Sequence, residues 1–276
     1  MMNGFPLRKM LATLAPAQTA GEAGHVVYSM DAGGGTVTLD QFIGQAFTLR
    51  FSGVRTCVAC GRPVKKFYGQ GMCWPCFQTA PEASPCIIRP ELCEAHLGKG
   101  RDVRWEQDHH NQEHIVYLAH TGGVKVGVTR STQVPTRWID QGAMLALPIA
   151  RVPYRQLAGA IEVDLKQHFA DRTEWRKMLL LSDVTMDEAA LLEARSKVFE
   201  VLDPELRPYL IPEAPVARLA YPLYNVPPKL ASVQLDKLPA ITGKLQGIKG
   251  QYLVWADGRV LNVRNHAGYH VEVEAA

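Results

Sequence analysis

Residues 57–76 read CVACGRPVKKFYGQGMCWPC, and this stretch decides how the middle of the chain folds. It holds two Cys-x-x-Cys turns with twelve residues between them. Two residues between thiolates let one tight turn aim both sulfurs at one ion, and two such turns complete a tetrahedral zinc shell. Four thiolates leave no coordination position open, so such an ion is structural. The sequence therefore predicts a structural zinc ion bound by Cys57, Cys60, Cys73 and Cys76; the alternative is unrelated free thiols.

Further metal-ligand residue types follow at looser spacing. They are Cys86, Cys93, His96, His109, His110 and His114. One interpretation is a second zinc ion held by Cys86, Cys93, His96 and His109. The other is a pair of buried neutral thiols beside a solvated run of histidines.

Basic and aromatic side chains gather around the first cysteines. The net charge of the whole chain is only +3, but no Asp or Glu occurs from Gln41 to Pro81. A local basic field of this kind suits an acidic polymer, and exposed rings can stack on bases. We therefore expect nucleic acid, either DNA or RNA, as a partner; an ordinary solvated face would show the same composition. The residues expected to contact nucleic acid are Arg62, Lys65, Lys66, Tyr68 and Trp74.

The cysteine count and the hydropathy indicate the cellular setting. Six cysteines in 276 residues are too few for a disulfide scaffold, so we expect a reducing, cytoplasmic environment. No apolar run approaches the roughly 18 residues of a membrane span, so no membrane partner is expected. Neither feature predicts the oligomeric state.

The rest of the chain mixes strand and helix patterns, which predicts a multidomain α+β protein. Strands are expected at 25–30 and 46–51, a hairpin at 114–130, and helices at 135–142, 155–170 and 185–201, the last opening on a capping box of Thr185 and Glu188. Seven prolines from 204 to 228 mark an extended linker, and 241–273 is β-rich. The predicted division is an N-terminal β segment (1–56), a zinc-binding ribbon region (57–112), a core (113–203), and a proline-rich linker with a C-terminal β domain (204–276).

The register of the hairpin can be predicted from its side chains. A three-residue loop, Thr121-Gly122-Gly123, pairs Val116 with Val128 and makes one face wholly apolar, whereas a two-residue turn mixes polar and apolar residues on both faces. The other face then carries Tyr117 opposite Gly127, with Lys125 beside them, and Gly127 would leave a hollow for a ligand. The alternative is a surface tyrosine and a solvated lysine.

The order of four motifs resembles the core of the GIY-YIG nucleases: Val116-Tyr117 and Lys125-Val126-Gly127 in a hairpin, Arg137 on the next helix and Glu162 on the one after. The resemblance implies that Tyr117 activates the attacking water, Arg137 stabilises the scissile phosphate, and Glu162 holds Mg²⁺ or Mn²⁺. Lys125 stands where the second motif usually has tyrosine, and its charge would lower the pKa of Tyr117. For Glu162 the alternative is an ordinary ion pair with Lys166 at i+4.

The whole chain is also similar to a bacterial family of unknown function that couples a cysteine-rich ribbon to three motifs. Here these read VKVGVTR at 124–130, RWIDQGA at 137–143 and GIKGQYL at 247–253. The resemblance implies further cysteines in the second metal region, at positions that Gly100 and His109 occupy in this sequence.

These patterns together predict a zinc-containing nucleic-acid-binding protein with a candidate metal-dependent phosphodiesterase site. One alternative is a non-catalytic zinc-ribbon adaptor that docks RNA, DNA or a ribonucleoprotein. Another is a purely structural zinc protein within a protein complex.

Overall fold

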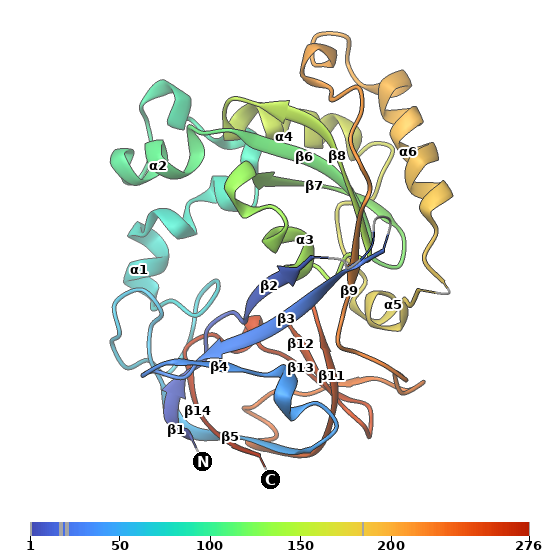
Figure 1. Cartoon of the computed structure of the whole chain (residues 1–276). Helices are drawn as coiled ribbons and strands as arrows, with labels where there is room; N and C mark the ends of the chain where they lie inside the picture. The colour runs from blue at the N-terminus through green and yellow to red at the C-terminus, as the bar shows by residue number, and fades with distance from the viewer. Residues whose placement is uncertain (1, 17–18, 20–21, 184, 276) are drawn as a thin grey trace. The chain divides into compact units, whose positions relative to one another are not determined.

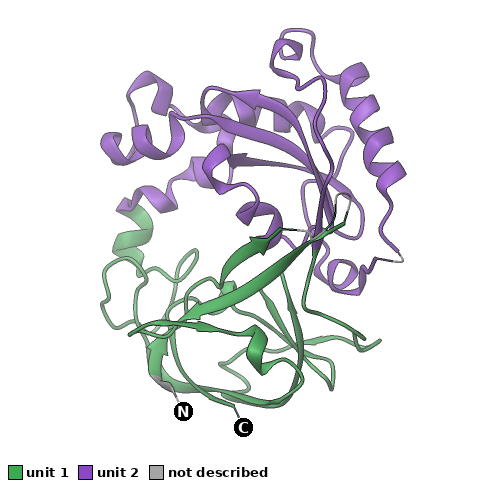
Figure 2. Cartoon of the chain, in the orientation of Figure 1, with its two compact units in different colours: residues 1–78, 220–276 green, residues 79–219 purple. Residues whose placement is uncertain are grey.

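The computed structural model describes residues 2–16, 19, 22–183 and 185–275. It mixes helices with two separate β-sheet regions, which confirms the predicted α+β class. The chain divides into two compact units, shown in Figure 2. Unit 1 is Met1–Gln78 with Ala220–Ala276, and unit 2 is Thr79–Leu219. The four-part division expected from the sequence stays a prediction, but its first and last segments both contribute strands to unit 1.

Unit 1 is built on a seven-stranded sheet in which strands from both ends of the chain pair (Figure 1). The order is β1 (Met2–Pro6), β14 (Tyr269–Ala275), β5 (Ala46–Arg55), β11 (Ala240–Lys249), β12 (Tyr252–Trp255), β13 (Arg259–Asn262) and β10 (Ala231–Ser232). Burial alternates along β14, as expected for a strand with one face in the core. Trp255 is fully buried, and its Nε1 donates to the Phe47 carbonyl at 3.3 Å. A second run of antiparallel strands comprises β2 (Leu11–Ala15), β3 (Gly24–Asp31) and β4 (Thr36–Thr38).

Unit 2 contains a sheet with the strand order β9 (Ala217–Ala220), β8 (Leu145–Val152), β6 (His114–His120) and β7 (Val124–Arg130). The β6–β7 pairing has the predicted register, with Val116 opposite Val128 and Tyr117 opposite Gly127. The three-residue loop is therefore confirmed. Strand β9 lies within the proline-rich stretch, which is thus not extended linker throughout.

Helices α4 (Arg155–Leu165) and α6 (Glu188–Val201) pack on the apolar face of this sheet, in one cluster with Val116, Val126 and Leu147. The other helices are α1 (Trp74–Thr79), α2 (Val103–His110), α3 (Thr136–Asp140) and α5 (Trp175–Leu180). Short 3₁₀ turns connect them, among them η3 (Pro85–Ile87) and η4 (Pro90–Leu92). Within the described part of the chain, none of the helices has the length and apolarity needed to cross a membrane.

Two predicted helix boundaries were wrong. Helix α4 ends at Leu165 rather than Ala170, although Phe169 still packs against the core. Helix α6 begins at Glu188, where the Asp187 carboxylate accepts from Ala190 N at 2.9 Å. Thr185 does not cap the helix, because its hydroxyl accepts instead from Ser182 N at 3.0 Å. A carboxylate is as good an N-cap as a hydroxyl, and it lies next to the first turn here.

Candidate functional site

The first cysteine group lies in unit 1 and has the geometry of a zinc site. The ligand sulfurs of Cys57, Cys60, Cys73 and Cys76 all lie within 4.8 Å of one another. The Cys60 and Cys73 sulfurs are 3.8 Å apart. Four sulfurs placed tetrahedrally about 2.3 Å from one zinc ion would be about 3.8 Å from each other. This donor set could therefore hold zinc with little movement of the side chains.

Backbone hydrogen bonds of the two turns aim these sulfurs inward. Gly61 N donates to Cys57 O at 2.9 Å, and Gly61 has a φ of +70°, which favours glycine. Cys73 N donates to the Cys57 sulfur at 3.1 Å. Gly71 also has a positive φ, and a Cβ atom there would lie 2.6 Å from Ala267 O. Glycine is thus favoured at position 61 by its backbone conformation and at position 71 by the close packing against Ala267 as well.

The surroundings of the Cys57 sulfur stabilise its negatively charged thiolate form. Burial acts to raise the pKa of the Cys57 thiol, but backbone N–H groups of Cys73, Cys60 and Ala59 point at it and lower the pKa to about 6. The thiolate is the form that binds a metal ion. Cys76 has a pKa raised to about 12, first because its thiol donates to Cys73 and Cys60. In the absence of a metal ion, Cys57 is therefore the thiol that loses its proton more readily, and Cys76 keeps its proton.

The predicted nucleic-acid residues lie on this ribbon. Tyr68 and Trp74 have ring centroids 4.9 Å apart, and Lys66 Nζ is 5.2 Å from the Tyr68 centroid. Arg62 and Lys65 are exposed, and Trp74 is 48% exposed. The sequence therefore located basic and aromatic side chains that the fold leaves accessible.

Two phenylalanines near these residues behave differently from each other. Phe77 was missed, yet its ring lies 6.3 Å from Tyr68 and 6.0 Å from Trp74, one turn of α1 further on. The i, i+3 spacing of Trp74 and Phe77 was the signal that could have identified it. Phe67 instead packs against the buried Tyr269, with ring centroids 5.5 Å apart, and is itself half-buried.

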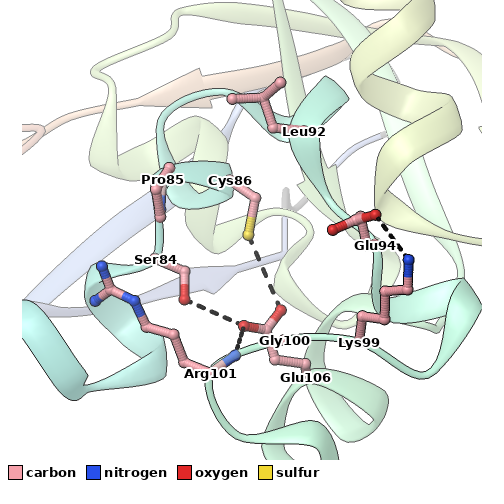
Figure 3. A pocket seen from close by; sticks show the side chains of 9 residues that line it. All are labelled: Ser84, Pro85, Cys86, Leu92, Glu94, Lys99, Gly100, Arg101 and Glu106. Carbon is pink, nitrogen blue, oxygen red and sulfur yellow. Dashed lines mark hydrogen bonds and ion pairs between the residues drawn. The ribbon is translucent and has the colours of Figure 1, made fainter.

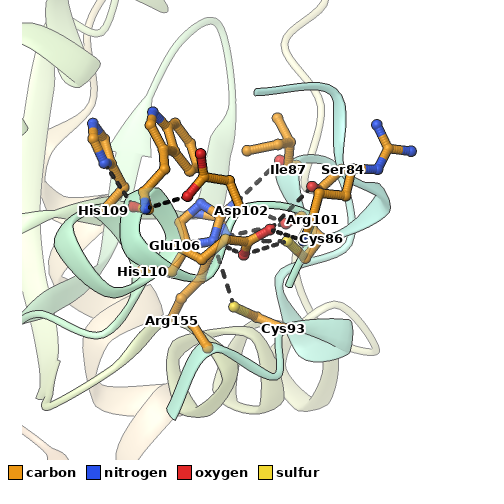
Figure 4. Close-up of polar contacts among 12 residues, drawn as sticks. Ser84, Cys86, Ile87, Cys93, Arg101, Asp102, Glu106, His109, His110 and Arg155 are labelled. Carbon is orange, nitrogen blue, oxygen red and sulfur yellow. Dashed lines mark hydrogen bonds and ion pairs between the residues drawn. The ribbon is translucent and has the colours of Figure 1, made fainter. Parts of the chain in front are cut away.

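A second group of metal-ligand residues lies in unit 2. Cys86, Cys93, Glu106 and His110 place one donor atom each within 4.8 Å of the others, and all four are buried. Figure 4 shows them with their polar neighbours. This group too could hold zinc, because two thiolates, an imidazole and a carboxylate are all zinc ligands.

This group replaces the ligand set predicted from the sequence. His96 and His109 lie outside it among the described residues. The His109 side chain points away from the cysteines (Figure 4), and its ring centroid lies 4.0 Å from that of Trp105. His96 stacks on Tyr154, with ring centroids 4.4 Å apart. Glu106 and His110 share one face of α2 because they are four residues apart. That i, i+4 spacing of two metal-ligand residue types was the available sequence signal for His110, the histidine that lies in this group.

The four residues predicted to be catalytic belong to unit 2. Tyr117 is fully buried, and a Cβ atom on Gly127 would lie 2.7 Å from its hydroxyl. The hollow expected above Gly127 is therefore filled by the phenol of Tyr117. Burial raises the pKa of Tyr117 to about 12, although Arg137 and Gln141 act to lower it. The phenol is thus fully protonated near neutral pH.

Lys125 and Glu162 are also withdrawn from solvent. Burial and the nearby Arg137 charge lower the pKa of Lys125 to about 8, against the effect of Glu162. Burial raises the pKa of Glu162, while Lys166 and Lys125 lower it. Lys166 Nζ lies 3.3 Å from the Glu162 carboxylate, so the i+4 ion pair is present as well. These charges are thus close enough to affect one another.

Glu162 and Tyr117 belong to elements on different faces of the sheet, although the Glu162 charge still acts on the pKa of Tyr117. Helix α4, which carries Glu162, packs on the face that includes Val116. Tyr117 points to the opposite face, where its ring lies 6.0 Å from that of Trp138 on α3. Lys125 lies on the edge strand β7, and its Nζ donates to Asp171 O at 3.0 Å.

The chain is therefore an α+β protein with two separate candidate metal centres, one in each unit. A family model described as "Protein of unknown function (DUF2797)" matches residues 44–271. The chain belongs to the DUF2797 family, so the predicted membership of a family of unknown function is confirmed. No match was found among curated proteins or among solved structures.

Proposed function

We propose that this protein binds single-stranded nucleic acid through a ribbon held together by a zinc ion at Cys57, Cys60, Cys73 and Cys76. The zinc would order a segment that has few apolar contacts of its own, because metal binding and folding are linked in such small modules. The bound ion would supply structure rather than chemistry, since four thiolates complete its shell.

The observation that carries this proposal is the aromatic cluster of the exposed Trp74 with the half-buried Tyr68 and Phe77, with Lys66 over the Tyr68 ring. Bases of an unpaired strand stack on such rings, and each stacked base contributes about 1–3 kcal/mol. Exposed cations close by in the sequence, Arg62 and Lys65, would neutralise backbone phosphates. In a duplex the bases already stack on each other, so rings of this kind favour single strands.

The test is the binding of labelled single-stranded and duplex oligonucleotides, each as DNA and as RNA, to the full chain. Trp74→Ala should weaken single-strand binding by about tenfold, as expected for the loss of one stacked base. The matched control is Trp175→Ala, since Trp175 also carries a cation over its ring, the Arg176 guanidinium at 4.2 Å, but lies on α5. Equal affinities of the two variants would contradict the proposal.

A second candidate function is metal-dependent phosphodiester cleavage in unit 2. It is favoured by the charges of Arg137 and Glu162, which act on both the buried Lys125 and the buried Tyr117. Glu162 would bind Mg²⁺ or Mn²⁺, which would polarise a phosphate oxygen, and Arg137 would contact that phosphate. Tyr117 would donate a hydrogen bond rather than accept a proton, and Lys125 would be the group able to exchange a proton near neutral pH.

Incubation of the full chain with single-stranded DNA and RNA, with and without Mg²⁺ or Mn²⁺, tests this second function. Cleavage should require the metal and should be lost in Glu162→Gln at an unchanged circular dichroism spectrum. Metal-independent cleavage, or full activity of the variant, would exclude Glu162 as the metal ligand. Binding without any cleavage would favour an adaptor, and no binding would favour a structural zinc protein.

A further inference from the structure

The second cysteine group differs in kind from the ribbon, and its surroundings assign it a separate role. We propose that Cys86, Cys93, Glu106 and His110 bind a zinc ion whose Glu106 side is open to a small anion. The inference does not depend on nucleic-acid binding, which concerns the other unit.

The donor atoms are close to the positions that a zinc ion needs. His110 Nδ1 lies 3.6 Å from the Cys93 sulfur and 3.8 Å from the Cys86 sulfur. In a tetrahedral zinc site a thiolate sulfur and an imidazole nitrogen are about 3.6 Å apart. Glu106 Oε2 lies 2.8 Å from His110 Nδ1 and 4.0 Å from the Cys86 sulfur. An ion would therefore require only a small shift of the carboxylate.

The Glu106 carboxylate is held in this orientation by its other oxygen. Oε1 accepts from Ser84 Oγ at 3.1 Å and from Arg101 N at 3.3 Å, which leaves Oε2 facing the cysteines (Figures 3 and 4). Gly100 makes room for this arrangement, because a Cβ atom there would lie 2.6 Å from Glu106 Cδ. Hydrogen bonds to the free oxygen of a ligating carboxylate are typical support for a metal site.

A divalent ion also balances the buried charge. Two thiolates and one carboxylate around a divalent cation leave one negative charge. The half-buried Arg155 guanidinium supplies the opposite charge, because it donates to Cys86 O at 2.9 and 3.0 Å. Buried charges persist in proteins when they are paired or coordinate a metal. This balance explains why an arginine is partly withdrawn from solvent next to two cysteines.

This site borders a pocket of about 300 Å³, shown in Figure 3. Cys86 and Glu106 are part of its wall, so the ion would be reached from their side. Lys99 and Arg101 also line the pocket, and its acids are the proposed ligand Glu106 and Glu94, which forms an exposed ion pair with Lys99 at 3.5 Å. With Glu106 bound to the ion, the other charged side chains of the rim would carry one net positive charge, which attracts anions. An anion from the pocket would bind on the Glu106 side, either as a fifth ligand or in place of the carboxylate, because zinc can expand its coordination beyond four.

The metal content of the purified full chain tests the ion itself. Wild-type protein should hold two zinc ions per chain, His110→Ala one, and the matched control His109→Ala two, because His109 sits beside His110 on α2 but outside the group. One ion in the wild type, or two in His110→Ala, would overturn the proposal.

Cobalt(II) substitution provides a measurement that needs no folded variant. Wild-type protein loaded with two cobalt ions should show sulfur-to-cobalt charge transfer for six cobalt–thiolate bonds, four from the ribbon and two from this site. An intensity that matches four bonds would overturn the ligand set.

Azide is the probe for the open side. It should change the visible spectrum of the two-cobalt protein in a saturable way. It should not change that of His110→Ala, whose single cobalt is enclosed by four cysteines. If the two-cobalt spectrum is unchanged by azide, the site is closed and that part of the proposal is wrong.

Discussion

Tyr117 lies directly opposite Gly127 in the β6–β7 pair, and a Cβ atom on Gly127 would fall 2.7 Å from the Tyr117 hydroxyl. The phenol is fully buried, so it cannot swing away into solvent. The glycine is therefore required by the packing of the tyrosine, and the pair forms a tightly fitted part of unit 2.

Gly127→Ala should destabilise the protein by about 1–3 kcal/mol, because overpacking a filled core forces side chains from their preferred rotamers. Gly123→Ala in the same hairpin is the control: nothing lies within 4 Å of the Cβ position there. Its effect should stay within about 0.5 kcal/mol. Urea unfolding of both variants measures the difference, and equal stabilities would contradict the packing argument.

The hairpin shows what the sequence can predict. Its register followed from one requirement, that Val116 and Val128 share an apolar face, and a shift of one residue would have exposed that face. The cysteine group of the ribbon could be predicted in the same way, since both Cys-x-x-Cys turns lie within residues 57–76. In both cases the decisive contacts join residues close together in the sequence.

The features that the sequence did not predict depend on contacts between residues far apart in the chain. His109 and His110 are adjacent, and only the phase of α2 relative to Cys86 and Cys93 decides which one turns inward. Gly127 indicated a close approach, but whether a ligand or the Tyr117 ring would fill the space depends on a rotamer fixed by packing. Likewise, the apolar pattern of helix α4 did not predict which face of the sheet the helix covers.

Cys73→Ser should remove one zinc ion per chain and open the ribbon, because metal binding provides the folding free energy of such a segment. The loss of unfolding free energy should be about 3 kcal/mol or more. Limited proteolysis gives a local measurement: cleavage within 57–76 should be slow in the wild type and fast in the variant. Chelator should accelerate cleavage of the wild type to the rate of the variant. An unchanged zinc content and unchanged cleavage would show that Cys73 is not a ligand.

The salt dependence of binding should reveal which cations contact phosphates. Changing Arg62, Lys65 and Lys66 together to alanine should reduce the slope of log affinity against log salt by about 2 for a single strand. The matched control changes three exposed cations of unit 2, Arg172, Lys177 and Lys197, and so removes the same charge. The control should keep the wild-type slope. If both triple variants lower the slope equally, net charge rather than the ribbon surface determines binding.

Lys125 should make the stability of the protein depend on pH above neutrality. Burial lowers its pKa from 10.5 to about 8 in the folded state. Between these two values the unfolded chain binds more protons at Lys125 than the folded chain does, so the unfolding free energy rises with pH in this window. Below about pH 8 the lysine is charged in both states, and the full cost of burying the charge is present. A shift of this size corresponds to about 3 kcal/mol at most.

Lys125→Met removes the buried charge at similar length. The variant should be more stable than the wild type at pH 7, and this advantage should shrink as the pH rises from about 8 to 10.5. Urea unfolding of both proteins at several pH values measures the difference, in which the titration of all other groups cancels. The result also bears on function. A lysine whose pKa lies near 8 can exchange protons close to neutral pH, as the proposed cleavage site requires. An advantage that stays constant across this range would show that Lys125 keeps its ordinary pKa and cannot serve in that role.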